Sequence, residues 1–220
     1  SAFAARKGVD GLIVRVSEET RHFALEIAAD GVPHVVIADR FEDQRVNYVY
    51  CNSTDASRAA VEHLLHLGHR RIGITHNAIL DTDHRDRIAA YEAALIAAGV
   101  EPDPNLVVPI SAEIGGGAAA FNRLMSLPEP PTAIFATDPK LTVGILNRAL
   151  DVGVRIPDEL SVIGMDDERL RKMTHPVYTA ICQNAAELGS QAGRWLCRQL
   201  AQGSRSNGGA SHIRAETAAF

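Results

Sequence analysis

The sequence predicts an α/β fold in which parallel strands are covered by helices on both faces. Three observations support this prediction. Short runs of aliphatic and β-branched residues recur along the 220 residues, amphipathic helical patterns separate most of these runs, and the connections between them are short. Strands that alternate with helices pair in parallel, because each helix returns the chain to the same end of the sheet. Seven such strands fit either one large sheet or two smaller ones.

The predicted strands are short and almost wholly apolar, as expected for strands buried on both faces. In chain order they are GLIV (11–14), HVVIA (34–38), YVYC (48–51), RIGIT (71–75), LVVPI (106–110), AIFA (133–136) and LSVIG (160–164). GSRSNGGAS (203–211) is predicted to be a flexible loop, because it is rich in glycine and serine.

The predicted helices are bounded by recognisable start and stop residues. Residues 54–67 and 86–98 each end before a glycine, which is the residue that most easily ends a helix. Residues 139–152 follow a capping Asp138 and begin with Pro139, and residues 185–201 follow Asn184. Their inward-facing residues are predicted to be Ala60, Val61, Leu64 and Leu65, then Ile88, Tyr91 and Leu95, and in the last helix Leu188, Ala192, Trp195 and Leu196.

Composition and charge exclude several classes of protein. Apolar residues make up 46% of the chain and charged residues 22%, as in ordinary globular proteins. A net charge of −5 argues against this chain gripping nucleic acid by itself. No apolar run approaches a membrane span, and the N-terminus lacks the order of a signal peptide. Three scattered cysteines predict neither a disulfide framework nor a zinc site, and they fit a reducing, cytoplasmic location.

Polar side chains follow most of the predicted strands. Arg15 follows the first strand, Asp39 the second, His76 the fourth, and Asp138 and Asp166 come soon after the last two. The carboxyl ends of parallel strands meet at one edge of a sheet, and ligands of such folds bind beyond that edge. Carboxylate and guanidinium groups make strong hydrogen bonds to hydroxyl groups. The pattern therefore favours binding of a hydroxyl-rich ligand without catalysis, and it predicts neither a metal nor a cofactor.

Other motifs are better explained without chemistry. HRD (84–86) lacks the asparagine of a kinase catalytic loop, and GGG (115–117), which lacks phosphate-binding spacing, is predicted to be a loop before a helix. His63, His66 and His69 are predicted to lie on a solvated surface, and no GxSxG motif indicates a hydrolase. The adjacent Asp166 and Asp167 do not fit a response regulator, whose acid pair follows the first strand.

Several stretches resemble the effector-binding domain of lactose-repressor-type (LacI/GalR) regulators, in order along nearly the whole chain. They are VDGLIV (9–14), GVPHVVIADR (31–40), HLLHLGHRRIGI (63–74), RIAAYEAALIAAGV (87–100), PPTAIFATD (130–138), ALDVGVRIPDELSVIGMDD (149–167) and HPVYTAICQNAAELGSQA (175–192). GHRRI and IPDELSVIGMDD are the most specific, and they separate such regulators from periplasmic sugar-binding proteins of the same fold.

The resemblance implies a type I periplasmic-binding-protein fold of two Rossmann-like subdomains with an effector cleft between them. Residues 1–51 and 182–210 would form the N-terminal subdomain, whose first strand would precede residue 1. Residues 52–181 would form the C-terminal subdomain, to which a tail of residues 211–220 would return. A helix-turn-helix DNA-binding head would precede this chain, and the domain would form a homodimer.

The resemblance also assigns effector-binding roles to particular residues. Arg87, four residues before Tyr91, matches the family's effector-binding arginine, and Asp166 matches its effector-binding aspartate. Together with Arg15, Asp39, His76 and Asp138, these residues form the predicted ligand set. Asp167 is expected to serve the structure rather than the ligand.

Two departures from the family pattern bear on the effector. Asp138 stands where relatives usually have asparagine, and an ionised carboxylate only accepts hydrogen bonds, which favours a hydroxyl- or amine-bearing effector over an anionic one. Ala185 stands where sugar-binding relatives often have an aromatic residue, so a stacking platform for a pyranose is missing there.

The primary hypothesis is the effector-sensing and dimerisation domain of a bacterial transcriptional regulator. The alternatives are a periplasmic sugar-binding protein of a transporter and an enzyme of Rossmann-like form. A helix-turn-helix upstream of residue 1 would support the first, a signal peptide the second, and a glycine-rich loop the third.

Overall fold

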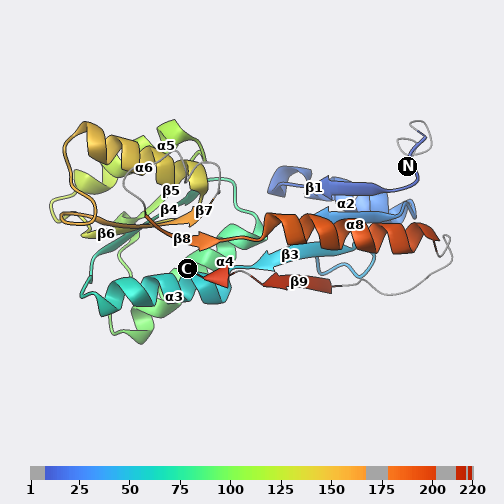
Figure 1. Cartoon of the computed structure of the whole chain (residues 1–220), viewed down its shortest axis with the longest axis horizontal. Coiled ribbons are helices and arrows are strands. Elements are labelled where there is room, and N and C mark those ends of the chain that lie inside the picture. Colours follow the sequence, from blue (N-terminus) through green and yellow to red (C-terminus); the bar gives the residue numbers. More distant parts are fainter. Residues whose placement is uncertain (1–7, 167–177, 202–211, 217, 220) are drawn as a thin grey trace. The chain divides into compact units, whose positions relative to one another are not determined.

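The computed structural model describes residues 8–166, 178–201, 212–216 and 218–219 of the chain. They form two compact units (Figure 1). The first unit comprises Ser1–Asn52, Leu80–Asp83 and Asn184–Glu216, and the second comprises Ser53–Ile79, His84–Gln183 and Thr217–Phe220. The chain therefore passes between units at 52/53, 183/184 and 216/217, and the short segment Leu80–Asp83 adds crossings at 79/80 and 83/84. The tail expected from residue 211 is divided, because its strand His212–Glu216 belongs to the first unit and only Thr217–Phe220 to the second.

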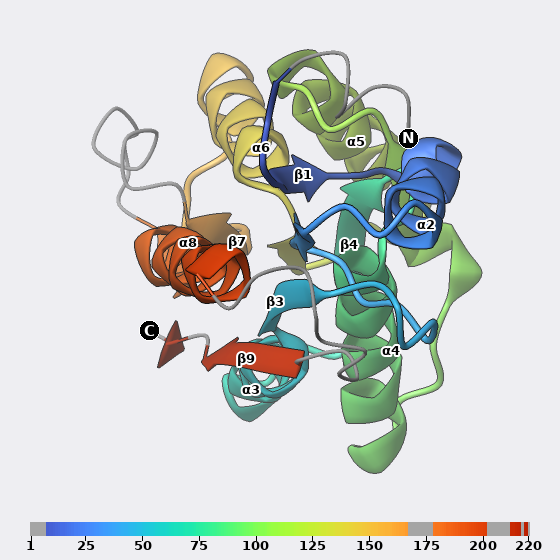
Figure 2. The ribbon, with the colours of Figure 1, turned by 90° about the vertical axis from the view of Figure 1, so that its right-hand side faces the viewer.

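The first unit is a parallel sheet with a helix on each face. Its strands lie in the order β1 (Leu12–Arg15), β2 (His34–Ile37), β3 (Tyr48–Asn52) and β9 (His212–Glu216), and each neighbouring pair is parallel. Helices α2 (Arg21–Ala29) and α8 (Ala185–Ala201) lie on opposite sides of these strands (Figure 2). The predicted strands and the 185–201 helix are present, whereas α2 and β9 were not predicted.

Alternation along β2 decides which helix packs on which face of this sheet. Val36 packs in a cluster with Ala24 of α2, whereas its neighbour Val35 packs with Ala192 of α8. Leu188, Trp195 and Leu196 pack against the α8 cluster, as the helical pattern predicted. Consecutive strand residues face opposite sides of a sheet, so an apolar pair such as Val35–Val36 can hold two helices at once.

The second unit has a larger sheet in the order β10-β8-β7-β6-β4-β5. Its strands are β4 (Ile72–Asn77), β5 (Val107–Ile110), β6 (Ala133–Ala136), β7 (Ser161–Asp166), β8 (Thr179–Cys182) and β10 (Ala218–Ala219). All neighbouring pairs are parallel except β10 with β8, which is antiparallel. β8 and β10 were not predicted.

No described helix of the chain is long and apolar enough to cross a membrane.

Among the described residues of the second unit, helices cover both faces of this sheet. Helices α3 (Thr54–His66) and α4 (Thr82–Ala97) pack on one face, and α5 (Ile114–Met125) and α6 (Pro139–Asp151) pack on the other. Phe135 of β6 lies in the α3/α4 cluster and its neighbour Ile134 lies in the α5/α6 cluster. The sheet is thus buried on both sides, which is why its strands read as continuous apolar runs.

The glycine run 115–117 is the first turn of α5 rather than a loop before a helix. The loop prediction was therefore wrong. Gly117 meets Gly144 of α6 where the two helices cross, and a Cβ built on Gly117 would lie 2.3 Å from the carbonyl oxygen of Leu141. Glycine is needed here because backbone approaches backbone, so the run serves helix packing rather than phosphate binding.

The GHRRI motif (68–72) makes hydrogen bonds near the amino ends of strands β6 and β7 in the second unit. Nδ1 of His69 lies 2.8 Å from Oγ1 of Thr132, just before β6, and its Nε2 lies 3.0 Å from Oγ of Ser161, the first residue of β7. Arg70 donates to the carbonyl of Leu65 at the end of α3.

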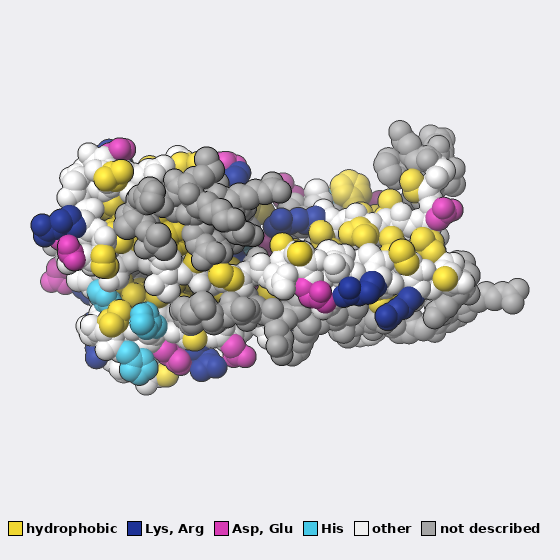
Figure 3. Space-filling view, in the orientation of Figure 1, with side chains coloured by type: hydrophobic (Ala, Val, Ile, Leu, Met, Phe, Trp, Pro, Cys, Tyr) yellow, Lys and Arg dark blue, Asp and Glu magenta, His cyan; other side chains and the backbone are white. Residues whose placement is uncertain are grey.

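Histidine side chains gather over that end of α3 (Figure 3), and no metal-binding group is found among the residues described.

Three histidines predict how stability changes with pH. Burial lowers the pKa of His34, His69 and His76 below the usual 6.5. Between the lowered pKa values and about 6.5, the unfolded chain binds more protons than the folded one, so the free energy of unfolding rises with pH in this window. We expect stability to fall as the pH drops below about 6.5, and to change little from pH 7 to 8. Urea unfolding at pH 5.5, 6.5 and 7.5 measures this.

A matched variant separates the histidine contribution from that of the carboxyl groups. Hydrogen bonds lower the pKa of Asp103 and Glu187 from their usual 3.8 and 4.5, so the contribution of these carboxyl groups lies in a more acidic range than that of the histidines. His69→Gln should therefore reduce the pH slope between 5.5 and 6.5, whereas the slope below pH 4.5 should remain. A chain that becomes more stable on going from pH 7.5 to 5.5 would contradict the assignment.

Candidate functional site

The polar rim of the second unit lies at the carboxyl ends of its parallel strands. β4 ends in His76 and Asn77, β6 is followed by Thr137 and Asp138, and β7 ends in Asp166. β4 pairs with β6, and β6 with β7, in parallel. The structure therefore brings three of the predicted ligand residues, His76, Asp138 and Asp166, to one edge of the sheet. The side chain of Asp166, and the whole of Asp167, lie outside the described residues.

Helix α4 brings Arg87 to the same edge. Its guanidinium is buried, with 4% of the residue exposed. Nη1 donates to the carbonyl oxygen of Thr137 at 2.6 Å, and Nε donates to Oγ of Ser53 at 3.2 Å. A hydrogen bond from a charged donor to a backbone carbonyl fixes the plane of the guanidinium. Arg87 is thus held rigidly against the residue that follows β6 and precedes Asp138.

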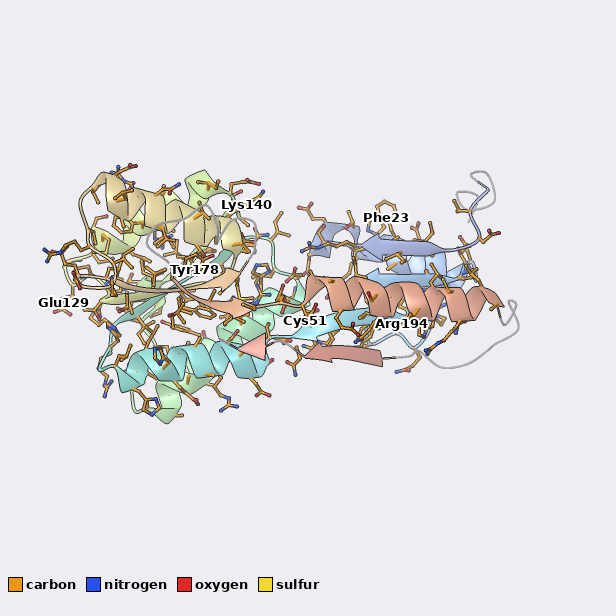
Figure 4. The ribbon with its side chains drawn as sticks, in the orientation of Figure 1. Phe23, Cys51, Glu129, Lys140, Tyr178 and Arg194 are labelled. Carbon is orange, nitrogen blue, oxygen red and sulfur yellow. The ribbon has the colours of Figure 1, made fainter. Side chains whose placement is uncertain are left out.

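Asp138 caps helix α6 and is half-buried. Its Oδ1 accepts a hydrogen bond from the backbone N–H of Lys140 at 2.8 Å, as the sequence predicted. This hydrogen bond satisfies a backbone N–H group in the first turn of α6. The Lys140 ammonium, shown in Figure 4, is engaged elsewhere, since it lies 3.0 Å from a carboxylate oxygen of Glu113. Asp138 therefore offers a fixed hydrogen-bond acceptor at the rim.

His76 is buried and neutral. Nδ1 lies 2.9 Å from the backbone carbonyl oxygen of Asn77, so Nδ1 carries the proton because a carbonyl can only accept. Burial lowers the pKa of His76, and the nearby His84 lowers it further. In this tautomer Nε2 is a hydrogen-bond acceptor. The described rim thus combines the guanidinium donor of Arg87 with the acceptors of Asp138 and His76.

The first unit contains the two remaining predicted residues, which differ sharply in their surroundings. Arg15 is exposed at the end of β1, and among the described residues its side chain makes no hydrogen bond or ion pair. Asp39 is 1% exposed, and its carboxylate accepts hydrogen bonds from Arg21, from Thr82 and from the backbone N–H of Arg40. Asp39 is therefore occupied by protein donors, whereas Arg15 is presented to solvent.

The hydrogen bonds of Asp39 and Arg87 involve four residues that the sequence did not indicate as functional. They are Arg21, Ser53, Thr82 and Thr137. Ser53 and Thr137 are single hydroxyl residues next to a helix start or a strand end, a position where such residues most often serve as caps. Arg21 begins α2, a helix that the sequence analysis did not predict. The local pattern of the sequence carries no signal that links any of the four to Arg87 or Asp39.

Comparison with known proteins gives a consistent result. Residues 61–217 match a family model described as a periplasmic binding protein-like domain. The chain is 30% identical over 196 residues to the HTH-type transcriptional repressor PurR of Haemophilus influenzae strain PittEE. The aligned region covers 89% of this chain and 58% of the relative. It is 29% identical over 194 residues to the ribose operon repressor of Haemophilus influenzae strain Rd, covering 88% and 58%.

A solved structure agrees with these sequence relatives. A LacI family transcriptional regulator from Mycobacterium smegmatis superposes with a TM-score of 0.84 at 26% identity, covering 99% of this chain and 80% of that one. The chain spans somewhat more than half the length of the two curated relatives. The similarity thus covers nearly all of this chain but only part of those proteins.

Proposed function

This chain belongs to the periplasmic binding protein-like domain family, and from that premise we propose that it is the effector-sensing domain of a LacI-type bacterial transcriptional regulator. The observation that carries the proposal is the polar rim of the second unit, where Arg87 is locked in place beside Asp138. The rim has hydrogen-bonding groups in fixed positions, which suits binding rather than catalysis. The similarity to two repressors and to a LacI family regulator supports the regulatory role.

The proposed effector is a small, hydroxyl- or amine-bearing molecule, such as a sugar or a related metabolite. Asp138 accepts hydrogen bonds, and Asp166 ends the neighbouring strand β7, so two carboxylates disfavour an anionic effector. Arg87 donates to the acceptor atoms of the same molecule, and Arg15 is the donor that we assign to the first unit. No cofactor or metal enters this proposal.

The proposed mechanism is a shift in population between two conformations. An effector changes the equilibrium only by its difference in affinity for the two states. In a homodimer, the favoured state would alter the spacing of two helix-turn-helix heads outside this chain, and so the affinity for operator DNA. We place the protein in the cytoplasm, with operator DNA as its macromolecular partner and no membrane partner.

A thermal-shift screen against sugars, polyols, nucleosides, amino acids and sugar phosphates tests the proposal. A neutral or amine-bearing compound at a concentration of 100 Kd should raise Tm by roughly 5–10 °C, because binding adds about 2.7 kcal/mol to stability. Arg87→Lys, which keeps the charge but cannot span Ser53 and Thr137, should lose most of this shift. A sugar phosphate that binds better than its parent sugar would contradict the effector class. A cooperative melt that no compound shifts counts against the effector role.

A further inference from the structure

Ser53 stands at the start of helix α3, but its hydroxyl does not cap that helix. A serine at such a position normally has an extended backbone, and its side chain accepts a hydrogen bond from an N–H group of the first turn. Ser53 instead has helical backbone angles, with φ −95° and ψ 0°, and no N–H of the described helix α3 donates to its side chain. Helix capping therefore does not account for this hydroxyl.

Asp138 shows the usual arrangement at another helix start of the same unit. Its φ of −141° and ψ of 140° are extended, and its carboxylate accepts from the N–H of Lys140 at 2.8 Å. An extended backbone lets the side chain turn back onto its own helix, as the Asp138 side chain does. The helical backbone of Ser53 explains why its hydroxyl does not make the same contact.

The Ser53 hydroxyl accepts a hydrogen bond from Arg87. Nε of Arg87 lies 3.2 Å from Oγ of Ser53, and Nη1 lies 2.6 Å from the carbonyl oxygen of Thr137. Ser53 and Thr137 are both fully buried, and the N–H and hydroxyl of Thr137 each donate to the carbonyl of Thr75 at 3.0 Å. A planar guanidinium held by one bond can still swing about it, whereas bonds from two of its nitrogens fix its orientation.

Ser57, one helical turn further along α3, provides a comparison within the same helix. It is also fully buried, but its hydroxyl has no hydrogen-bond partner among the described residues. The N–H of Ser57 donates to the carbonyl of Ser53 at 2.8 Å, so the helix begins from the Ser53 backbone and not from its side chain. Of these two buried serines, Ser53 is the one whose hydroxyl contacts Arg87.

We infer that Ser53 is a positioning residue, whose hydroxyl orients the Arg87 guanidinium instead of capping α3. All of the groups involved belong to the second unit. The inference rests on the proposed effector role of Arg87 for its functional meaning, because a donor that is already oriented loses less freedom when an acceptor group of the effector binds. The orientation itself can be measured without any effector.

The test compares Ser53→Ala, Ser53→Thr and Ser57→Ala with the parent chain, without added ligand. The first readout is the NMR signal of the Arg87 Nε–H group, identified by its disappearance in Arg87→Lys. Ser53→Ala removes the acceptor, so the signal should shift and its exchange with solvent hydrogen should become about tenfold faster or more. Ser53→Thr keeps the hydroxyl and should keep the parent signal. Ser57→Ala, the matched control, should also leave the signal unchanged.

The second readout is amide hydrogen exchange of residues 55 and 56, whose N–H groups a capping side chain at position 53 would protect. If Ser53 were a helix cap, Ser53→Ala would speed exchange at these two positions and leave the Arg87 signal as it is. We expect the converse, with exchange at 55 and 56 unchanged and the Arg87 signal altered. An unchanged Arg87 signal in Ser53→Ala, or an equal change in Ser57→Ala, would overturn the inference. Neither result depends on whether any compound in the effector screen binds.

Discussion

Replacing Gly144 by alanine is expected to destabilise the second unit by about 3 kcal/mol or more, because two helix backbones meet at this residue. A Cβ on Gly144 would lie 2.0 Å from the carbonyl oxygen of Ile114 and 2.8 Å from Cα of Gly117. These are backbone atoms, which cannot rotate away as a side chain can. Helices α5 and α6 would have to separate, and the apolar cluster between them and the sheet would lose its close packing.

The glycine run at 115–117 supplies a matched control for this prediction. A Cβ on Gly115 meets no atom within 4 Å, whereas one on Gly117 meets Leu141 and Gly144. Gly115→Ala should therefore be neutral or stabilise slightly, since alanine favours the helix over glycine by up to about 1 kcal/mol. Gly117→Ala should behave like Gly144→Ala. Urea unfolding of the three variants measures the difference, and equal stabilities for Gly115→Ala and Gly117→Ala would disprove the close crossing.

Replacing Asp166 by asparagine is expected to weaken effector binding about 100-fold while leaving the melting temperature within a few degrees of the parent. Asp166 ends β7 at the rim, and we propose that its carboxylate accepts hydrogen bonds from effector hydroxyl or amine groups. Asparagine has the same size but carries no charge, and it presents donors where the effector also donates. The loss of charge-assisted hydrogen bonds, together with the new donor–donor contact, corresponds to about 3 kcal/mol.

Calorimetric titration with whichever compound raises Tm in the screen measures this effect. Asp151→Asn is the matched control, because Asp151 is an exposed carboxylate at the far end of α6 in the same unit. It should bind the compound as the parent does. Equal affinity in Asp166→Asn and the parent would remove Asp166 from the site and leave the assignment to Arg87 and Asp138.

Local patterns in the sequence predicted most of the strands and helices of both units. Strand AIFA and helix 185–201 were predicted with the bounds that the structure shows, because apolar runs and caps involve residues that are neighbours in sequence. The missed elements lack such signals. β9 is the segment His212–Glu216, with three charged or titratable residues among five, and it becomes a strand only by pairing with β3. The glycine run was misinterpreted because its partner, Gly144, lies on another helix.

The same division holds for the candidate site. The sequence by itself determined which polar residues follow the strands. Because the strands are parallel, their carboxyl ends share one edge of the sheet, and His76, Asp138 and Asp166 lie at that edge. Only the tertiary structure decided what each side chain meets. The carboxylate of Asp39, a predicted ligand residue, accepts hydrogen bonds from Arg21 and Thr82, which lie 18 and 43 residues away along the chain. Periodicity and capping act within a few residues, whereas the partner of a buried charge is chosen by which distant segments the packed core brings together.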